Sequence, residues 1–235
     1  MSPELQKLIH LLRTQLGYSE QAGGYTKFGS WYGKTVEFDS DYSAQPWCDM
    51  FLSWGAHSLG YDKWFGQFAY TVDHAKWFIE KGAWGHAPKP GAVVFFDWGG
   101  SEVVDNIDHV GLVTSVDGDT IHTIEGNVDG QYVREKVRDQ SYVVGYGYPD
   151  KIRQSTDALI LAKKAAAESA LPVGAATMGV PVGAGGLAGQ QDLGALVIPV
   201  LIAALVVLAY LKVQHAGVRL AAATRRHPGR HGTAE

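Results

Sequence analysis

The sequence holds a single cysteine, Cys48, among its 235 residues. A lone cysteine excludes an internal disulfide, so the folded part depends on its apolar core for stability. A hydrophobic content of 46% and seven tryptophans are sufficient for such a core.

A basic surplus is also missing from most of the chain. The net charge is −4, but residues 212–235 hold five Lys and Arg against one Glu, a net of +4, which leaves −8 for the rest. Binding to nucleic acid requires a basic face. The acidic balance therefore argues against a nucleic-acid partner.

Charge is absent altogether from residues 193–211, a run of 19 residues. At about 1.5 Å per helical residue this run spans about 28 Å, close to the hydrocarbon thickness of a bilayer. Gly194 and Pro199 are tolerated in membrane helices, and Tyr210 and Lys212 suit the interface. The pattern predicts a transmembrane helix over 193–213, in preference to a core helix, for which no second domain offers a packing surface.

The basic tail, residues 214–235, suggests an orientation for this span. Cytoplasmic flanks carry the excess of Lys and Arg, so we expect the tail in the cytoplasm and the folded domain outside. Charges at Glu4, Lys7 and Arg13 argue against a secretory signal. We therefore expect a single-pass membrane protein, inserted by its tail or delivered by a phage lysis apparatus.

The remaining segments differ in composition. Residues 1–150 are dense in aromatics and turn signals, as in a compact domain, and begin with an amphipathic helix pattern at Leu5, Leu8, Ile9, Leu12 and Leu16. Residues 151–171 are Ala-rich and form a predicted helical connector. Residues 172–192 are rich in Gly and Ala and form a predicted linker.

Cys48 stands where a loop gives way to a helix pattern marked by Phe51, Trp54 and Leu59. In the first turn of that helix, unpaired N–H groups and the helix dipole favour a thiolate. Position alone leaves a buried core cysteine equally open.

A nucleophilic cysteine needs a general base, and the base needs a group that orients it. Of the nine histidines, three lie in the tail, and His10, His57 and His74 lie on predicted helices that do not direct them to Cys48. His86 lies in a loop, and periodicity does not exclude it. His109 and His122 remain as strand residues.

Strand geometry separates these two histidines. Residues 109–116 and 120–127 flank the turn sequence "DGD" and predict a β-hairpin. With Gly118 at the turn centre, His109 lies opposite Asn127 and one diagonal step from Glu125. Side chains alternate between faces, so these three share one face and His122 lies on the other. This arrangement favours His109 as the base.

The segments "PWCDMFLSW", "DHVGLV" and "IEGN" resemble the three signature segments of CHAP domains, the cysteine, histidine-dependent amidohydrolases/peptidases. The resemblance covers roughly residues 4–148 and includes "GYSEQAGGYTKFGSWYG" before the cysteine, as in phage and actinobacterial members. It implies an α+β, papain-like fold with helices packed on an antiparallel β-sheet. It also implies cleavage of amide bonds in bacterial peptidoglycan.

Carried over by position, the resemblance makes Cys48 the nucleophile, His109 its base and Glu125 the orienting group, which Asn127 supports or replaces. We expect the Cys48 N–H, or Gln45, to donate to the oxyanion. Trp47, beside the nucleophile, is the expected cleft residue.

Some CHAP members bind calcium through acidic residues before the cysteine, and here Asp39 and Asp41 offer oxygen ligands two residues apart. The rest of such a site is not evident, so calcium is a weak expectation and no other cofactor is expected.

The leading hypothesis is a peptidoglycan amidase or endopeptidase anchored in a membrane. The alternatives are a catalytically silent module that binds wall or supports a virion or envelope assembly, and a papain-like protease that acts on proteins.

Overall fold

The computed structural model describes residues 1–38, 40–129 and 131–169. The predicted linker (172–192), membrane span (193–213) and tail (214–235) lie outside the described residues. Within the described ranges, no helix has the length and hydropathy needed to cross a bilayer.

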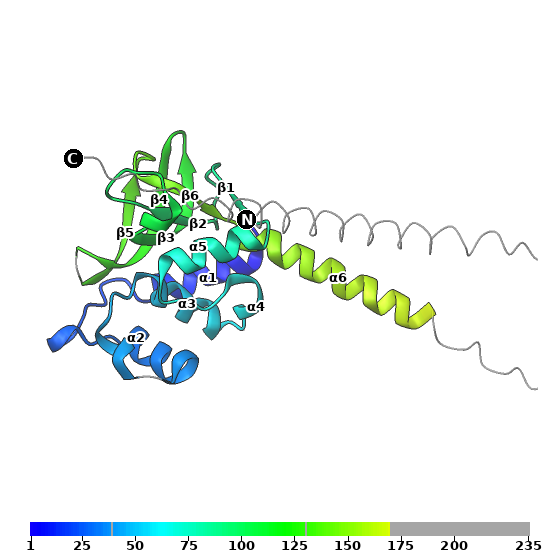
Figure 1. Ribbon diagram of the computed structural model, residues 1–235, viewed down its shortest axis with the longest axis horizontal. Helices are drawn as coiled ribbons and strands as arrows, with labels where there is room; N and C mark the ends of the chain where they lie inside the picture. Colours follow the sequence, from blue (N-terminus) through cyan, green and yellow to red (C-terminus); the bar gives the residue numbers. More distant parts are fainter. Residues whose placement is uncertain (39, 130, 170–235) are drawn as a thin grey trace, which may run out of the picture. The chain divides into compact units, whose positions relative to one another are not determined.

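The described strands form one six-stranded sheet in the order β1-β6-β2-β3-β4-β5 (Figure 1). Every pair of neighbouring strands runs antiparallel. The strands are β1 (Trp84–Gly85), β2 (Val93–Phe96), β3 (His109–Asp117), β4 (Thr120–Val128), β5 (Tyr132–Arg138) and β6 (Val143–Gly147).

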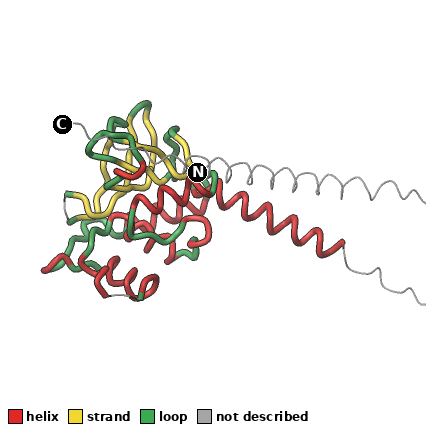
Figure 2. The backbone as a smooth tube through the Cα atoms, viewed as in Figure 1, coloured by secondary structure: helices red, strands yellow, loops and turns green. Residues whose placement is uncertain are grey.

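The helices are mostly short and cluster in the first half of the chain (Figure 2). They are α1 (Pro3–Arg13), α2 (Lys27–Tyr32), α3 (Cys48–Ser58), α4 (Asp62–Phe65), α5 (Thr71–Glu80) and α6 (Pro149–Ser169). Single turns are found at η1 (Ala22–Gly24), η2 (Gly33–Glu37), η3 (Ser40–Ala44) and η4 (Val104–Asn106).

Helix α1 shows how the sequence sets its own boundaries. Ser2 is the N-cap, its side chain accepts a hydrogen bond from the Leu5 N–H, and Pro3 occupies the first helical position. The helix ends at Arg13, so Leu16 lies beyond it and is 44% exposed. The predicted helix was therefore one turn too long at its C-terminal end.

The core lies between one face of the sheet and helices α1, α3 and α5 (Figure 1). Alternation along the strands directs a single set of apolar side chains to this face, namely Val93, Phe95, Val110, Leu112 and Ile124. A smaller cluster with Val94, Phe96 and Tyr146 covers the opposite face. The prediction of an α+β fold with helices on an antiparallel sheet is confirmed.

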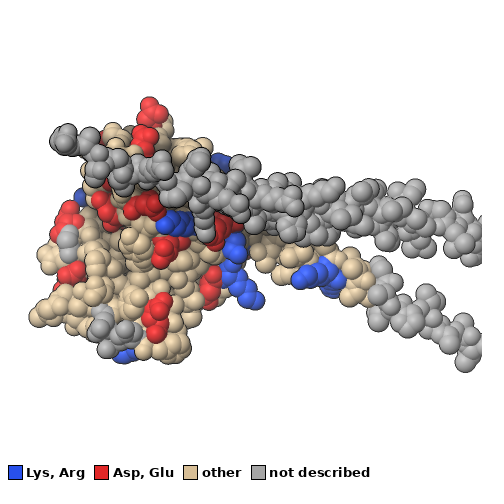
Figure 3. Space-filling view, in the orientation of Figure 1, with Lys and Arg blue, Asp and Glu red and all other residues tan. Residues whose placement is uncertain are grey.

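The predicted connector begins two residues early, at Pro149, and is helical through Ser169. Its first turn buries Ile152, whereas Leu159, Ile160 and Leu161 are exposed. On the side of the domain that Figure 3 shows, acidic side chains outnumber basic ones, which agrees with the negative balance of the sequence.

Candidate active site

Cys48 is the first residue of α3, as the apolar pattern predicts. It is 4% exposed, and α3 packs against strands β3 and β4. Trp47, the N-cap residue, forms no side-chain cap, so no cap side chain occupies the N–H groups of the first turn. The thiol therefore lies at the positive end of the helix dipole, next to the strands of the predicted hairpin.

His109 opens β3 and lies opposite Phe96 of β2. Its Nε2 lies 2.9 Å from Oε2 of Glu125, which comes from β4. Gly111, between them on the sheet, leaves room for this contact, because a Cβ there would lie 2.7 Å from Cγ of Glu125. The hairpin thus places His109 and Glu125 on one face, as its alternation predicts.

The carboxylate of Glu125 is fully buried, and both of its oxygens are occupied. Arg138 of β5 donates from Nε to Oε1 at 3.0 Å and from Nη2 to Oε2 at 2.7 Å. The hydroxyl of Thr123 also donates to Oε1. A buried carboxylate with four hydrogen bonds has one fixed orientation, so it also fixes the His109 ring.

These contacts set the charges of the pair. Burial alone would lower the pKa of His109, but hydrogen bonds and charges from Cys48 and Glu125 outweigh it and raise that pKa to about 9. Burial alone would raise the pKa of Glu125, but hydrogen bonds from His109, Arg138 and Thr123 lower it to about 2. At neutral pH, Glu125 is therefore ionised and His109 is protonated.

The side chain of Cys48 also interacts with His109 and helps to raise the pKa of the imidazole. Because Nε2 is occupied by Glu125, Nδ1 is the ring nitrogen left to face the sulfur. The row Cys48, His109, Glu125, Arg138 therefore runs from a helix N-terminus across three neighbouring strands. A thiol at a helix N-terminus, an imidazole and a fixed carboxylate in this order can perform nucleophilic catalysis.

Asn127 does not join this row. It lies in left-handed backbone with φ of 57°, where the pairing of β4 with β5 is irregular between Glu125 and Val128. No hydrogen bond among the described residues links it to His109 or Glu125. Arg138 and Thr123 hold Glu125 in its place, and the sequence analysis missed both.

Trp47 is buried, not in a cleft. Its ring is 0% exposed and stacks on Phe28 at 5.3 Å, and its Nε1 donates to Glu20 at 2.8 Å. The expectation that Trp47 contacts substrate is therefore wrong for this conformation, since neighbouring rings enclose it. Gln45 is exposed and lines a pocket, which leaves its side chain free to contact a ligand.

The other histidines have different surroundings. His74 is fully buried between Asp49, at 2.8 Å from Nδ1, and the Phe65 carbonyl, at 2.9 Å from Nε2. His57 pairs with Asp62, and His122 lies opposite Ser115 on the strand pair. His86, which the sequence left open, is an exposed residue just after β1.

The calcium expectation falls outside the described part of the chain at Asp39, and nothing is described of the Asp41 side chain. Among the side chains that are described, no three His, Cys, Asp or Glu residues lie close enough to hold a metal ion.

One comparison with known proteins matches a family model. Residues 40–127 match the family model of the CHAP domain, and this range includes Cys48, His109 and Glu125. No curated protein sequence matches the chain.

The chain also resembles solved structures at low identity. One is the P60 domain of an antigen from M. avium subspecies paratuberculosis, with 16% identity, a TM-score of 0.37, and coverage of 62% of this chain and 94% of that one. Another is Ly7917, with 17% identity, a TM-score of 0.38 and coverage of 62% of each chain. A structure of Ly7917 with the hydrolysing product of MDP shows 19% identity, a TM-score of 0.34, and coverage of 62% and 63%. The chain thus spans less than two thirds of Ly7917.

Proposed function

We propose that this chain hydrolyses an amide bond of bacterial peptidoglycan, with Cys48 as nucleophile and His109 as general acid and base. The observation that carries the proposal is Cys48 at the start of α3, packed on β3 and β4, together with His109, whose Nε2 lies 2.9 Å from the buried carboxylate of Glu125. The match of residues 40–127 to the CHAP domain supports the amide-hydrolase chemistry and the wall substrate.

The first half of the reaction forms an acyl-enzyme. The Cys48 thiolate attacks the carbonyl carbon of the amide, and the carbonyl oxygen becomes an oxyanion. The backbone N–H of Cys48, at the start of α3, is a suitable donor to this oxyanion. Protonated His109 then transfers its Nδ1 proton to the leaving nitrogen, the C–N bond breaks, and a thioester remains on Cys48.

The second half returns the enzyme to its starting state. Neutral His109 takes a proton from water, and the hydroxide attacks the thioester carbon. Collapse of the second tetrahedral intermediate releases a carboxylic acid and the Cys48 thiolate. Throughout, ionised Glu125 holds the imidazole ring and stabilises its charged form. The role of Arg138 is to keep Glu125 ionised and in place.

The experiment uses purified sacculi and measures loss of turbidity together with newly released amine ends. Cys48→Ala and His109→Ala should reduce both signals to the background rate, because the acyl-enzyme cannot form or break down. His122→Ala is the matched control, since His122 belongs to the same hairpin but lies on the other face. Retained hydrolysis in the Cys48→Ala protein would overturn the proposal.

The same preparation separates the alternatives. A silent wall-binding module would bind sacculi without releasing amine ends. A protease directed at proteins would digest casein and leave the sacculi intact. Mass spectrometry of the released muropeptides then identifies the bond as the amidase or the endopeptidase target.

For the location we propose a membrane anchor at residues 193–213 with the catalytic domain outside. The uncharged run and the basic residues after it support this orientation. Protease treatment of intact cells tests it, and a domain that resists protease until lysis would contradict it.

A further inference from the structure

An exposed tryptophan lies against the imidazole of the candidate base. Trp98 follows the end of β2 by two residues, and its ring centroid lies 5.7 Å from that of His109, with 31° between the ring planes. Trp98 is 41% exposed, whereas His109 is 7% exposed. Because the planes are closer to parallel than to perpendicular, the indole lies over the face of the imidazole, whereas Glu125 contacts its edge at Nε2.

A second ring belongs to the same stack. Phe96 is the cross-strand partner of His109, and their ring centroids are 6.0 Å apart. The rings of Phe96 and Trp98 stack at 4.9 Å with 11° between their planes. A cation interacts favourably with an aromatic face within about 6 Å of its centroid. Both rings are therefore placed to stabilise the protonated form of His109.

These rings also contact the second cation of the site. The guanidinium carbon of Arg138 lies 4.9 Å from the ring centroid of Trp98 and 5.7 Å from that of Phe96. His109 and Arg138 are the two cationic groups that hydrogen-bond to the buried Glu125. Trp98 thus lies against both cationic partners of one carboxylate.

The turn after β2 fixes the position of the indole. The backbone N–H of Trp98 lies 3.3 Å from each carboxylate oxygen of Asp108, the residue that directly precedes His109. The carboxylate of Asp97 accepts a hydrogen bond from the N–H of Ser101 at 2.7 Å and closes the turn. The indole is therefore held by the same segment that carries the base.

We infer that Trp98 is a positioning residue for the reaction, whose ring fixes the plane of the His109 imidazole and stabilises its protonated form. The inference rests on the proposed function, in which protonated His109 gives its proton to the leaving nitrogen. The other charged or titratable groups around the imidazole are Cys48 of α3, Glu125 of β4, Arg138 of β5 behind Glu125, and Asp108. All of these remain in a Trp98 variant, so a change in the pKa of His109 isolates the contribution of the indole.

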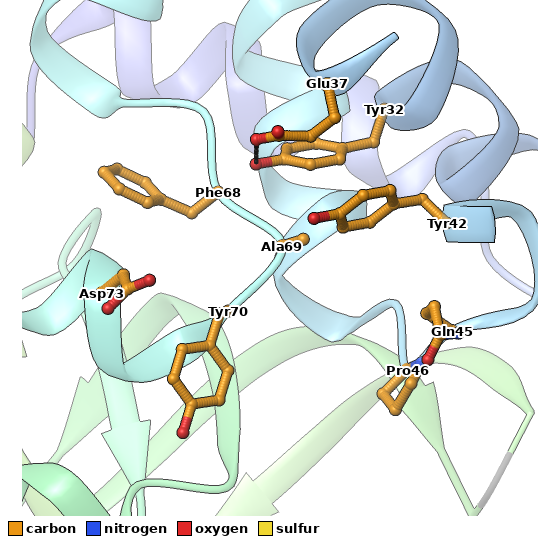
Figure 4. Close-up of a pocket in the computed structure, with 9 residues that line it drawn as sticks. All are labelled: Tyr32, Glu37, Tyr42, Gln45, Pro46, Phe68, Ala69, Tyr70 and Asp73. Carbon is orange, nitrogen blue, oxygen red and sulfur yellow. Dashed lines mark hydrogen bonds between the residues drawn. The ribbon is translucent and has the colours of Figure 1, made fainter. Parts of the chain in front are cut away.

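Trp98 does not line the pocket to which Gln45 belongs (Figure 4). The described residues that line this pocket lie between Tyr32 and Asp73 in the sequence. A substitution at Trp98 therefore leaves the walls of that pocket unchanged. We expect its effect in the protonation of His109 and not in KM.

The test measures the pKa of His109 by NMR, from the Cε1–H signal of the full-length chain in detergent between about pH 6 and 10.5. Loss of the signal in His109→Ala assigns it. Trp98→Leu keeps an apolar side chain without a ring face, and the pKa, about 9 in the unmodified chain, should fall by about half a unit to one unit. Trp98→Phe keeps a weaker ring face and should fall less. The alkaline limb of amine release from sacculi should move by the same amount.

Trp31→Leu is the matched control, because Trp31 also packs on a histidine, His57, at 5.2 Å. It should leave the titration of His109 unchanged. Since Trp98 is partly exposed, its variants should fold, which unfolding curves check. An unchanged His109 pKa in Trp98→Leu, a Phe variant shifted as far as the Leu variant, or a raised KM with an unmoved alkaline limb would overturn the inference. The expected NMR shift without any release of amines would instead overturn the proposed function.

Discussion

Replacing Glu125 with Gln tests the electrostatic role of the buried carboxylate most directly. The substitution keeps the size of the side chain and removes its charge. The pKa of His109 stands at about 9 against an ordinary value of 6.5. That difference corresponds to roughly 3 kcal/mol of net stabilisation of the imidazolium, which Cys48 and Glu125 provide against the cost of burial.

The expected result is a shift of the alkaline limb of the pH profile. His109 must carry a proton to give to the leaving nitrogen, so activity is present below its pKa and is lost as pH rises through about 9. If Glu125 provides about half of the stabilisation, the limb in the Glu125→Gln protein falls by about one pH unit or more. We also expect kcat/KM at neutral pH to fall by roughly 10²- to 10⁴-fold, as for other orienting groups.

The assay is amine release from sacculi between pH 5 and 10, with alkylation by iodoacetamide as a readout that needs no substrate. Because Cys48 is the only cysteine, the alkylated fraction reports one site. Glu135→Gln is the control, since Glu135 is an exposed carboxylate of the neighbouring strand β5, paired at the surface with Arg13. Removing the charge of Glu125 leaves Arg138 without its partner, so unfolding curves must show that the variant is folded at each pH. An alkaline limb at the wild-type position in folded Glu125→Gln protein would refute the reasoning.

Two further predictions concern residues around the pair. Arg138→Met removes both hydrogen bonds to Glu125, and we expect at least a tenfold loss of kcat/KM that Arg138→Lys restores in part. If Met and Lys variants retain equal, full activity on sacculi, Arg138 has no positioning role. Trp47→Ala should lower the free energy of unfolding by about 3–5 kcal/mol in urea titrations, because the ring is fully buried, whereas Trp47→Phe should keep KM near its original value. A large rise in KM for folded Trp47→Phe protein would show that the ring contacts substrate after all.

The local patterns of the sequence were sufficient for the elements that carry the thiol, the imidazole and the carboxylate. A 3.6-residue period marks α3 and places Cys48 at its start. A "DGD" turn fixes the hairpin, and alternation then puts His109 and Glu125 on one face. The predicted pairing holds at Leu112 and Ile124, and a bulge after Val113 shifts it by one residue near the turn. The catalytic roles of these residues stay predictions until the variants are measured.

Strand alternation and register do not predict which side chains contact Glu125, because those contacts join residues far apart in the sequence. In strand register, Arg134 lies directly opposite Glu125 and would be its expected partner. Arg134 instead pairs with Asp129 at 3.2 Å, and Arg138, opposite Ile121, reaches Glu125 along the same face. No local feature of β5 distinguishes these two arginines. The alternation that placed Asn127 beside His109 fails for a related reason, since its left-handed backbone ends the regular strand.

The contacts of Trp47 show why the position of α3, the helix that begins with Cys48, depends on more of the chain than the segment that matches the CHAP domain. The matched range begins at residue 40, yet the partners of the Trp47 ring, Glu20 and Phe28, precede it. Helix α1 also precedes it, and the Leu12 side chain packs against Gly55 of α3 so closely that a Cβ there would lie 2.5 Å from it. The N-terminal segment therefore covers the back of α3 and fixes where its first residue, the candidate nucleophile, meets the sheet. A sequence motif around a cysteine identifies the reacting atom, but its position relative to His109 is set by contacts that the motif does not contain.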